Sequence, residues 1–446
     1  MMNVGFVSLG CSKNLVDTEM TIGLFKKNNY NIVNNPEQAD IIVINTCGFI
    51  EPAKQEAINT ILEMAEYKKK KCKYLIVMGC LVQRYKDELA KSIPEVDLFI
   101  KYQEYDTIWE QIEKLLQDNR EQTISNCLDF SDRVITTGQN FAYLRIAEGC
   151  SNRCTYCAIP YIRGKFVSRT MEDILNEANS LVKQGYRELI VIAQDTSKYG
   201  IDIYGEPKLA ILLEKLAKIE GLKWVRFLYT YPESITDELI KVVKENEKIC
   251  KYFDIPVQHI SNSVLKRMNR KSNGDSIRNV ISKIRAEIPG VIVRTTVMVG
   301  FPGETKEDFE QLYEFVQWAE FDRLGAFMYS KEDGTPAEKL KEHIHPMTKK
   351  SRYKKIMQLQ QNISDNVMKK QIGRRFEVLI ENESFDGKYY IGRSCNEVPD
   401  IDGVIYVEKS QEELIDKFVS VEITGSRDYD LIGKIAIKKC SQKIHL

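Results

Sequence analysis

Runs of apolar residues of strand length alternate with helical patterns over residues 1–120. The segments NVGFVSLG, DIIVINTC and YLIVMGC are almost continuously apolar, and EPAKQEAINTILEMAEYKKK, between the second and the third, has its apolar residues at helical spacing. Strands that are apolar at nearly every position are typical of parallel sheets buried on both faces. This alternation predicts an α/β domain with a parallel sheet over residues 1–120.

Residues 121–139 show little periodicity, and we interpret them as a linker. A second alternation of strands and helices begins at residue 140 and extends to residue 367. Its strand candidates are FAYLRIAE, ELIVIAQD, WVRFLYTY, YFDIPVQ, VIVRTTVMVG and RLGAFMYS, separated by helical stretches such as MEDILNEANSLVKQG. Eight strand–helix units would close a barrel, so six predict an open or partial (βα)6 barrel.

The pattern changes again after a long helical stretch, KKSRYKKIMQLQQNISDNVMKKQIG. Five short strand candidates follow it: RFEVLIENE, YYIGRS, GVIYVE, FVSVEITGS and LIGKIAIKK. They predict a small antiparallel β-barrel over residues 368–440. The fold class expected for the chain is therefore α/β, with a parallel-sheet domain, a partial barrel and a small β-barrel in that order.

The composition of the chain limits the possible classes of function. The 446 residues hold 64 Lys and Arg against 64 Asp and Glu, so overall charge gives no argument for a nucleic-acid partner. The N-terminus reads directly as a strand, and we expect neither a signal peptide nor a membrane-spanning segment. Eleven cysteines without a secretion signal predict reduced thiols in the cytoplasm, where clustered cysteines bind metals or catalyse.

Three cysteines lie close together in the segment EGCSNRCTYC, at Cys150, Cys154 and Cys157. They follow the first strand candidate of the barrel, at the end of barrel strands where active sites form. A zinc site would need a fourth ligand nearby, and the following segment AIPYIRGK has no Cys or His. Three thiolates on a four-iron cluster would leave one iron open for a small molecule.

Three further cysteines each follow an apolar strand candidate of the N-terminal domain, at Cys11, Cys47 and Cys80. The carboxyl ends of parallel strands lie along one edge of a sheet, so we expect these cysteines to meet in space. Glycine stands beside each of them, at positions 10, 48 and 79, and allows the backbone to approach a bulky cluster. A second three-cysteine cluster with an open iron is therefore predicted. The other five cysteines, Cys72, Cys127, Cys250, Cys395 and Cys440, show no spacing rule.

CSNRCTYC resembles the Cys-x3-Cys-x2-Cys motif of the radical S-adenosylmethionine (SAM) enzymes. Two three-cysteine sets on one chain resemble, more narrowly, the methylthiotransferases, which join a cluster domain, a radical SAM barrel and a small barrel called TRAM. The resemblance implies two 4Fe-4S clusters, with SAM on the open iron of the first cluster. It also implies that the second cluster holds the sulfur to be inserted, that one SAM methylates this sulfur and that another yields the radical.

Several positions match family segments near SAM. VMVGFPGET (297–305), AQDT (193–196) and FDIPVQH (253–259) are such segments. The resulting candidates for cofactor binding are Tyr156, Gln194, Asp195, Arg226, Gln258, Arg294 and Gly300. We expect His259 to be a hydrogen-bonded rim residue, and we name no catalytic residue beyond the cluster ligands.

Two branches of the family have different substrates, a tRNA isopentenyl-adenosine and an aspartate of protein twelve of the small ribosomal subunit. The opening VGFVSLGCSKNLVDTE and the segment YIGRSCNEVPDIDGVIYVE resemble the protein branch. Residues 368–446 hold 13 Lys and Arg against 14 Asp and Glu, a net charge of −1, which suits a basic protein better than tRNA. We therefore expect methylthiolation of that aspartate at its β-carbon.

The same resemblance implies partners for the reaction: the ribosomal protein, free or in the ribosome, an electron donor such as flavodoxin or ferredoxin, and a sulfur donor. We expect the C-terminal domain to dock the ribosomal protein and bring its aspartate to the barrel mouth. The alternative outside the enzymes is an iron–sulfur electron carrier or redox sensor. That alternative explains six cysteines but not the barrel or the GFPGET loop.

Overall fold

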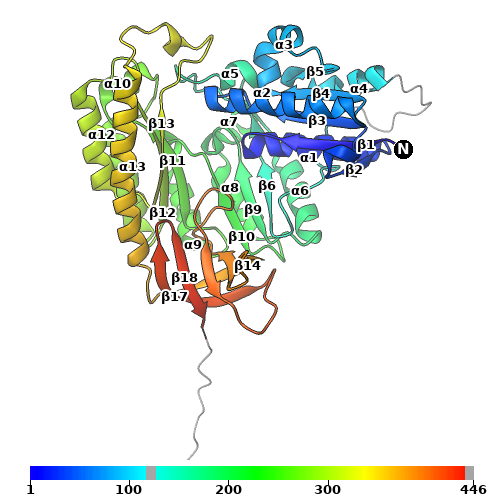
Figure 1. Cartoon of the computed structure of the whole chain (residues 1–446). Coiled ribbons are helices and arrows are strands. Elements are labelled where there is room, and N and C mark those ends of the chain that lie inside the picture. The colour runs from blue at the N-terminus through cyan, green and yellow to red at the C-terminus, as the bar shows by residue number, and fades with distance from the viewer. Residues whose placement is uncertain (117–126, 437–446) are drawn as a thin grey trace, which may run out of the picture.

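A computed structural model of the chain describes residues 1–116 and 127–436 (Figure 1). Residues 121–126 of the predicted linker, the outer ends of the first and last predicted domains, and Cys440 lie outside these ranges. The C-terminal barrel lies at one end of the central domain, and the N-terminal sheet lies toward the other end (Figure 1). Among the described helices, none combines the length and the apolar character needed to cross a membrane.

Five parallel strands form the N-terminal sheet, in the order β2-β1-β3-β4-β5. The predicted strands are β1 (Asn3–Ser8), β3 (Ile41–Thr46) and β4 (Tyr74–Gly79). Helices α1 (Ser12–Lys27) and α4 (Ile108–Leu116) pack on one face, and α2 (Glu51–Ala65) and α3 (Cys80–Ser92) pack on the other. The predicted sheet, buried on both faces, is confirmed.

The sequence pattern did not predict the two edge strands of this sheet. They are β2 (Asn31–Val33) and β5 (Leu98–Lys101), with three and four residues. A strand this short holds too few residues to show a hydrophobic period. Three short 3-10 helices complete the domain: η1 (Pro36–Gln38), η2 (Glu66–Lys69) and η3 (Tyr102–Thr107).

Six parallel strands form the wall of the central domain, in two sheets with the orders β10-β9-β6 and β11-β12-β13. Each corresponds to one predicted strand, so the six-unit prediction is confirmed. Their bounds are β6 (Phe141–Arg145), β9 (Glu188–Ile192), β10 (Trp224–Phe227), β11 (Tyr252–Gln258), β12 (Ile292–Val299) and β13 (Arg323–Met328). The two sheets share an isolated backbone bridge between Val225 and Ile249, so the wall is not continuously hydrogen-bonded.

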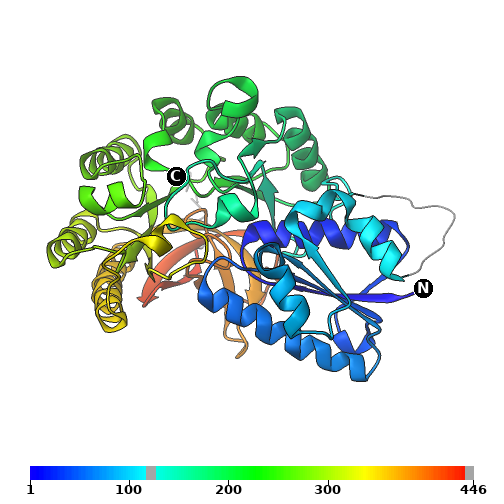
Figure 2. The same cartoon turned by 90° about the horizontal axis from the view of Figure 1, so that it is seen from above.

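Helices form an arc on the outer side of these strands, as Figure 2 shows from above. They are α6 (Met171–Lys183), α8 (Leu209–Ala217), α9 (Asp237–Glu245), α11 (Gly274–Glu287) and α12 (Lys306–Ala319), with the shorter α5 (Ile159–Ile162), α7 (Ile201–Tyr204) and α10 (Asn262–Arg267). A short antiparallel pair, β7 (Ala147–Glu148) and β8 (Val167–Ser168), flanks the cysteine loop. Three 3-10 helices lie in the loops: η4 (Thr196–Lys198), η5 (Pro232–Ser234) and η6 (Pro336–Lys339).

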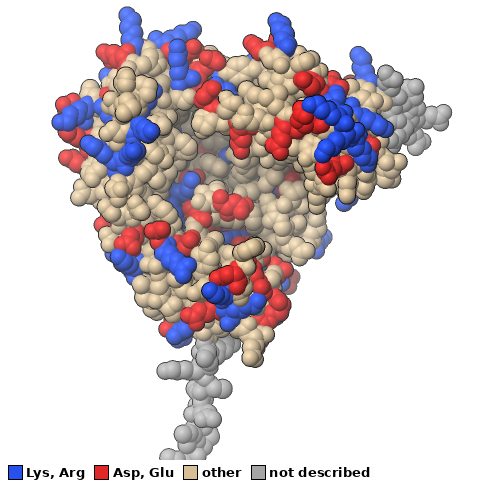
Figure 3. All heavy atoms as spheres, viewed as in Figure 1, with Lys and Arg blue, Asp and Glu red and all other residues tan. Residues whose placement is uncertain are grey.

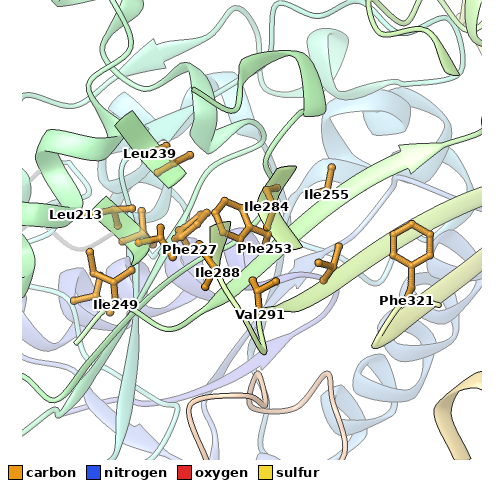
Figure 4. Packing of buried hydrophobic residues seen from close by; sticks show 14 of the residues in the cluster. Leu213, Phe227, Leu239, Ile249, Phe253, Ile255, Ile284, Ile288, Val291 and Phe321 are labelled. Carbon is orange, nitrogen blue, oxygen red and sulfur yellow. The ribbon is translucent and has the colours of Figure 1, made fainter. Parts of the chain in front are cut away.

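Side-chain packing joins the two sheets where backbone bonds do not. Phe227 of β10 and Phe253 of β11 meet edge to face, with 5.3 Å between ring centroids. Leu213, Leu239 and Ile284 of the outer helices belong to the same core (Figure 4). Aromatic pairs of this geometry add about 0.5–1.5 kcal/mol to the gain from burial. This core holds the strand ends, and therefore the site, in a fixed arrangement.

The long helix α13 (Pro346–Lys369) leads into a closed barrel of five strands in the order β14-β15-β16-β18-β17. The strands are β14 (Arg375–Glu383), β15 (Tyr389–Arg393), β16 (Ile405–Glu408), β17 (Phe418–Arg427) and β18 (Asp430–Ile435). The barrel is not wholly antiparallel as predicted, because β16 and β18 run parallel. Five strands cannot alternate in direction around a closed ring, so one neighbouring pair must run parallel.

The C-terminal barrel packs against the start of the central strands. Arg393 of β15 pairs with Glu188, the first residue of β9, and Tyr252, the first residue of β11, donates a hydrogen bond to Asp402 over 2.8 Å. The ring centroids of Trp224 and Phe418 lie 5.0 Å apart. The expectation that this domain brings the substrate to the barrel mouth is therefore wrong. It closes the opposite end of the barrel from the cysteine loop.

Candidate active site

The loop that carries Cys150, Cys154 and Cys157 follows β7 at the carboxyl end of the barrel strands. Its backbone is anchored at three points: the Cys150 N–H donates to Gly164 O over 3.2 Å, the Thr155 N–H to Met268 O over 3.1 Å, and the Cys157 N–H to Cys154 O over 3.0 Å. These hydrogen bonds fix the backbone of the loop that carries the three cysteines.

Burial controls the chemistry of these thiols. It raises the pKa of Cys150 and of Cys157 above that of a free thiol. The Tyr231 hydroxyl lies 3.8 Å from the Cys154 Sγ. Thiols with raised pKa stay protonated until a metal displaces the proton, so metal binding at this loop would release protons.

The side chains of Asp195 and Gln194 reach the cysteine loop, where they form hydrogen bonds that hold the loop in place. The buried Asp195 carboxylate accepts a hydrogen bond from the Asn152 side chain over 2.8 Å, which fixes the loop between Cys150 and Cys154. The Gln194 side chain donates to Glu148 over 2.6 Å. Its Oε1 atom is buried and has no hydrogen-bond partner among the described residues, so it remains available to a ligand.

Three other predicted positions also lie on this side of the barrel. Gln258 ends β11 with φ of 68°, and Gly300 follows β12 with φ of 74°. A Cβ on Gly300 would lie 2.4 Å from Lys349 Cγ, so the close packing requires glycine. Tyr156 packs edge to face on Phe301, with 6.4 Å between ring centroids. These residues form the wall beside the cysteine loop.

The structure does not bring Arg226 and Arg294 to the loop. Arg226 is fully buried, and its Nε atom pairs with Glu188, at the start of β9, over 2.9 Å. Arg294 pairs with Asp254 over 2.8 Å and lines a cavity next to the C-terminal barrel. Arg294 lies early in β12, and the Arg226 side chain reaches back to the first residue of β9, whereas ligands of such barrels bind where the strands end. Sequence patterns show that a polar residue faces inward, but not at which end its long side chain finds a partner.

Arg270 is a residue of this site that the sequence analysis missed. It is 7% exposed, and its guanidinium stacks 4.2 Å above the ring centroid of Tyr231, which itself contacts Cys154. One of its N–H groups donates to Pro256 O over 2.8 Å, but Nε and Nη1 have no partner among the described residues. A buried cation with two free donors fits a ligand carboxylate. Arg270 lies in an ordinary polar segment, and no motif marked it.

Cys11, Cys47 and Cys80 follow β1, β3 and β4, which are neighbours in the parallel sheet. Cys11 caps α1, and Cys80 is the first residue of α3. Burial raises the pKa of Cys47 and of Cys80, and the charges of neighbouring cysteines of the set raise both pKa values further, as expected where three thiols converge. The structure therefore brings the three cysteines to one edge of the sheet, as predicted.

The glycines beside these cysteines are required by close packing. A Cβ on Gly10 would lie 2.7 Å from Cys47 Cβ, and a Cβ on Gly48 would lie 2.7 Å from Leu81 Cα. Gly79 has φ of 103°, and a Cβ there would lie 2.3 Å from Asn45 Oδ1. The three loops are thus packed against one another, with their cysteines at the junctions.

Arg163 connects the two cysteine sets. It lies just after α5, and its Nη2 atom is 3.8 Å from Cys80 Sγ and 2.8 Å from Asp17. Its Nη1 atom donates over 3.0 Å to Glu148, two residues before Cys150. Burial raises the pKa of Cys80 to about 12, and the Arg163 charge opposes part of this rise. One guanidinium therefore touches both halves of the site.

Ion pairs hold the N-terminal domain in place across the mouth. Arg145, on β6, pairs with Asp17 of α1 and, over 2.9 Å, with Glu148. Burial raises the pKa of Glu148, but the Arg163 and Arg145 charges outweigh this effect and lower it to about 2. On the far side of the mouth, Arg84 of α3 donates to Glu332 over 3.0 Å. Figure 3 shows a hollow on one face of the molecule, with acidic and basic side chains around it.

Each cysteine set fits a four-iron cluster better than a single ion. The cysteines of both sets form no disulfide, and no three Cys, His, Asp or Glu side chains in the described ranges are grouped to hold one metal ion. In a cluster each thiolate binds a different iron, so three ligands stand further apart than around a single ion. Three soft thiolates beside tightly packed glycines suit such a cluster. Neither set has a fourth cysteine, so a cluster held by either set would have one iron without a thiolate ligand.

A partial barrel with this cysteine loop, joined to a second three-cysteine domain, defines a radical SAM enzyme of the methylthiotransferase type. Sequence models of families match in the same order: Uncharacterized protein family UPF0004 over residues 3–101, the radical SAM superfamily over 144–316 and the TRAM domain over 372–436. The chain belongs to the family of ribosomal protein uS12 methylthiotransferases. Its cofactors are therefore 4Fe-4S clusters and SAM.

Curated relatives support this assignment along the whole chain. The ribosomal protein uS12 methylthiotransferase RimO of Alkaliphilus oremlandii is 66% identical, over 97% of this chain and 99% of the relative. The protein of the same name from Caldicellulosiruptor saccharolyticus is 51% identical, over 98% and 100%. Among solved structures, the radical SAM methyltransferase TsrM of Kitasatospora setae matches with a TM-score of 0.58, at 11% identity, over 75% of this chain and 77% of that one. That structural likeness supports the fold.

Proposed function

We propose that the protein adds a methylthio group to the β-carbon of an aspartate in uS12, protein twelve of the small ribosomal subunit. The observation that carries this proposal is the pair of three-cysteine sets joined by Arg163 at the barrel mouth. An electron carrier would need no barrel with free donors beside its cluster. The relatives named as uS12 methylthiotransferases support the protein substrate over a tRNA adenosine.

The chain's own residues divide the work between the two sets. When bound, the clusters and SAM supply a carbon-centred radical, a sulfur atom and a methyl group. Cys150, Cys154 and Cys157 would hold the cluster that binds SAM. Arg270, beside them, would bind the SAM carboxylate, and Gln258, Gly300 and Tyr156 would shape the nucleoside pocket. Arg226 and Arg294 have no part in this proposal.

Cys11, Cys47 and Cys80 would hold the second cluster, on which the sulfur is carried. The N-terminal domain, fixed across the mouth by Arg145 and Arg163, would keep that sulfur within reach of the substrate carbon and exclude water. An electron donor such as flavodoxin or ferredoxin and a sulfur donor complete the partners. The cysteines of both sets form no disulfide, which fits work in a reducing, cytoplasmic compartment.

The test combines enzyme, SAM, a reductant and sulfide with either purified uS12 or tRNA under anaerobic conditions. Mass spectrometry should find one methylthio group on a uS12 aspartate and none on tRNA. The Cys11→Ala variant, which keeps the barrel site, is the matched control and should leave uS12 unmodified. Modification of a tRNA adenosine with unchanged uS12 would overturn the substrate, and absence of SAM cleavage would favour an electron carrier.

A further inference from the structure

Lys13 is buried at the junction of the N-terminal domain and the barrel. It is the second residue of α1, two positions after Cys11, and is 7% exposed. Its ammonium nitrogen lies over the ring of Tyr229, 3.0 Å from the ring centroid. A lysine normally extends its charged end into water, so burial of this ammonium calls for an explanation.

No carboxylate in the described part of the chain pairs with this ammonium. Among the described residues Lys13 forms no ion pair and no hydrogen bond, and the first turn of α1 contains no acidic residue. Asp17, one turn further on, is already paired with Arg145 and Arg163. The positive end of the helix dipole adds to the cost of a cation at this position. The Tyr229 ring face offers part of the missing stabilisation, and a buried ammonium otherwise requires an anion.

Tyr229 is held in a strained backbone conformation. Its φ is 64°, in the left-handed region that non-glycine residues rarely adopt. Its N–H donates to Asp254 over 3.0 Å, and its carbonyl accepts the Thr196 N–H over 3.0 Å. Strain of this kind persists where surrounding bonds enforce it, and it concentrates at ligand sites. The barrel therefore fixes the ring beneath the Lys13 ammonium.

This pair of residues joins two segments that each carry a residue of, or in contact with, one cysteine set. Lys13 is two residues from Cys11, and Tyr229 is two residues from Tyr231, whose hydroxyl is 3.8 Å from Cys154 Sγ. A ligand that reaches the Lys13 ammonium therefore lies next to both halves of the site. That position is where a substrate carbon must be to lose hydrogen at one set and gain sulfur from the other.

We propose that Lys13 binds the side-chain carboxylate of the substrate aspartate, with Tyr229 positioning the ammonium. This inference rests on the proposed function, since the reacting carbon is bonded to that carboxylate. Pairing the carboxylate with Lys13 would fix the carbon between the two sets. The rival explanation is that the ammonium only offsets the negative charge of the cluster held by Cys11.

Binding measurements separate these two explanations. Anaerobic, cluster-loaded enzyme would be titrated with purified uS12 and with uS12 whose modified aspartate is replaced by Asn. Wild-type enzyme should bind the Asp form roughly 10- to 100-fold more tightly, as expected for a hydrogen-bonded charge pair. Lys13→Met, which keeps the length of the side chain without its charge, should bind the two forms equally. Lys13→Arg should retain part of the preference.

Two further measurements show that the loss is local. The Lys69→Met variant removes an exposed lysine that pairs with Glu66 and should keep the full preference for the Asp form. Iron content should be the same in Lys13→Met, Lys69→Met and wild type. A variant that loses iron but keeps the wild-type ratio of Kd values would overturn the inference and support the rival explanation.

Failure of the inference differs from failure of the proposed function. Methylthiolated uS12 together with equal Asp preference in wild type and Lys13→Met would remove only the role of Lys13. A wild-type enzyme with no preference for Asp over Asn has the same consequence. Wild-type enzyme that neither binds nor modifies uS12 would overturn the substrate itself, and with it the inference.

Discussion

The two cysteine sets are built in different ways. Cys150, Cys154 and Cys157 lie on one loop, and the hydrogen bonds of that loop fix their spacing. Cys11, Cys47 and Cys80 come from the ends of three neighbouring strands, and only the fold of the sheet brings them together. The first site is a local property of the sequence, whereas the second depends on parallel register over the whole N-terminal domain.

This difference determines what each site tolerates. A loop site depends on its anchors, such as the Asn152–Asp195 hydrogen bond of 2.8 Å. The strand-end site depends on close approach between loops, which glycines at positions 10, 48 and 79 permit. We therefore expect the strand-end site to be the more sensitive to changes that leave its ligands intact. The following predictions test this comparison.

The largest expected effect comes from removing the ligands of each set in turn. Wild-type protein should bind about eight irons after anaerobic reconstitution, and either triple Cys→Ala variant should bind about four. Loss of the loop set should abolish deoxyadenosine formation from SAM. Loss of the strand-end set should spare that cleavage and stop methylthio transfer. Iron analysis and product chromatography measure both effects.

Replacement of Cys72 and Cys250 by Ala provides the matched control, because both are buried cysteines outside the two sets. That variant should keep about eight irons by the same reasoning. Equal loss of deoxyadenosine formation in the two triple variants would show that the sets do not divide the work. Iron at the wild-type level in either triple variant would show that its cysteines are not ligands.

The same contrast explains what could be predicted from the sequence. The loop set was visible as a motif, and the strand-end set was visible once the apolar strands were recognised as neighbours in a parallel sheet. Arg163, Arg270 and Lys13 gave no such signal, because their partners lie far away in the sequence. Arg226 and Arg294 show the converse: an inward-facing arginine was predicted, but its partner at the other end of the barrel was not.

Domain contacts were the other part that patterns could not supply. The parallel pair of strands in the C-terminal barrel follows from closing a ring of five strands, but the place of this barrel at the start of the central strands rests on contacts such as Arg393 with Glu188. Hydrophobic periods describe one element at a time, and they carry no information about which domain surfaces meet.

The next largest effect should come from adding one methyl group at Gly79, which should affect the strand-end set and leave the loop set unchanged. Gly79 has φ of 103° and ψ of −156°, a region essentially confined to glycine, and an added Cβ would lie 2.7 Å from Thr46 O. Gly79→Ala should destabilise the protein by about 2–5 kcal/mol and lose the strand-end iron while keeping the loop iron. Thermal melting and iron analysis on the same sample measure this.

Gly185→Ala provides a matched control. Gly185 also has φ of 103°, but nothing lies within 4 Å of an added Cβ. Gly185→Ala should lower the free energy of unfolding only by the cost of a non-glycine residue at positive φ, about 1–2 kcal/mol, and both clusters should be retained. If the two variants lost the same stability and the same iron, close packing at Gly79 would not matter to the site.

Arg163 contacts both halves of the site, so its replacement should affect the two sets together. Its side chain is 2% exposed and pairs with Asp17 over 2.8 Å and Glu148 over 3.0 Å. Arg163→Met removes one of the two guanidinium groups that pair with these carboxylates, leaves Arg145 as the other, and should cost about 3 kcal/mol. The exposed pair of Lys69 and Glu66 is the control, since Lys69→Met should change stability by no more than about 0.5 kcal/mol. Similar melting temperatures for the two variants would contradict a structural role for the bridge.

The smallest expected effect is a pH dependence of stability that arises in the central barrel and not in the N-terminal domain. His259, just after β11, is fully buried, and its Nδ1 atom accepts the Ser261 N–H over 3.0 Å. Burial lowers its pKa to about 3. The four histidines are at positions 259, 343, 345 and 445, so the N-terminal domain has none. Histidine titration between pH 7.5 and 5.5 should therefore report on the barrel and not on the strand-end set.

The sign of this effect follows from where the proton binds. Unfolded His259 takes up a proton as the pH falls through about 6.5, whereas folded His259 stays neutral until far lower pH, so acidification favours the unfolded chain. The contribution of His259 to the free energy of unfolding is fully present above pH 6.5. This contribution should decrease by about 1.4 kcal/mol between pH 7.5 and 5.5. Urea denaturation at the two pH values should show this decrease in wild type and in the exposed-histidine variant His343→Gln, but not in His259→Gln. An equal decrease in all three proteins would mean that the acid sensitivity arises outside the barrel wall at His259.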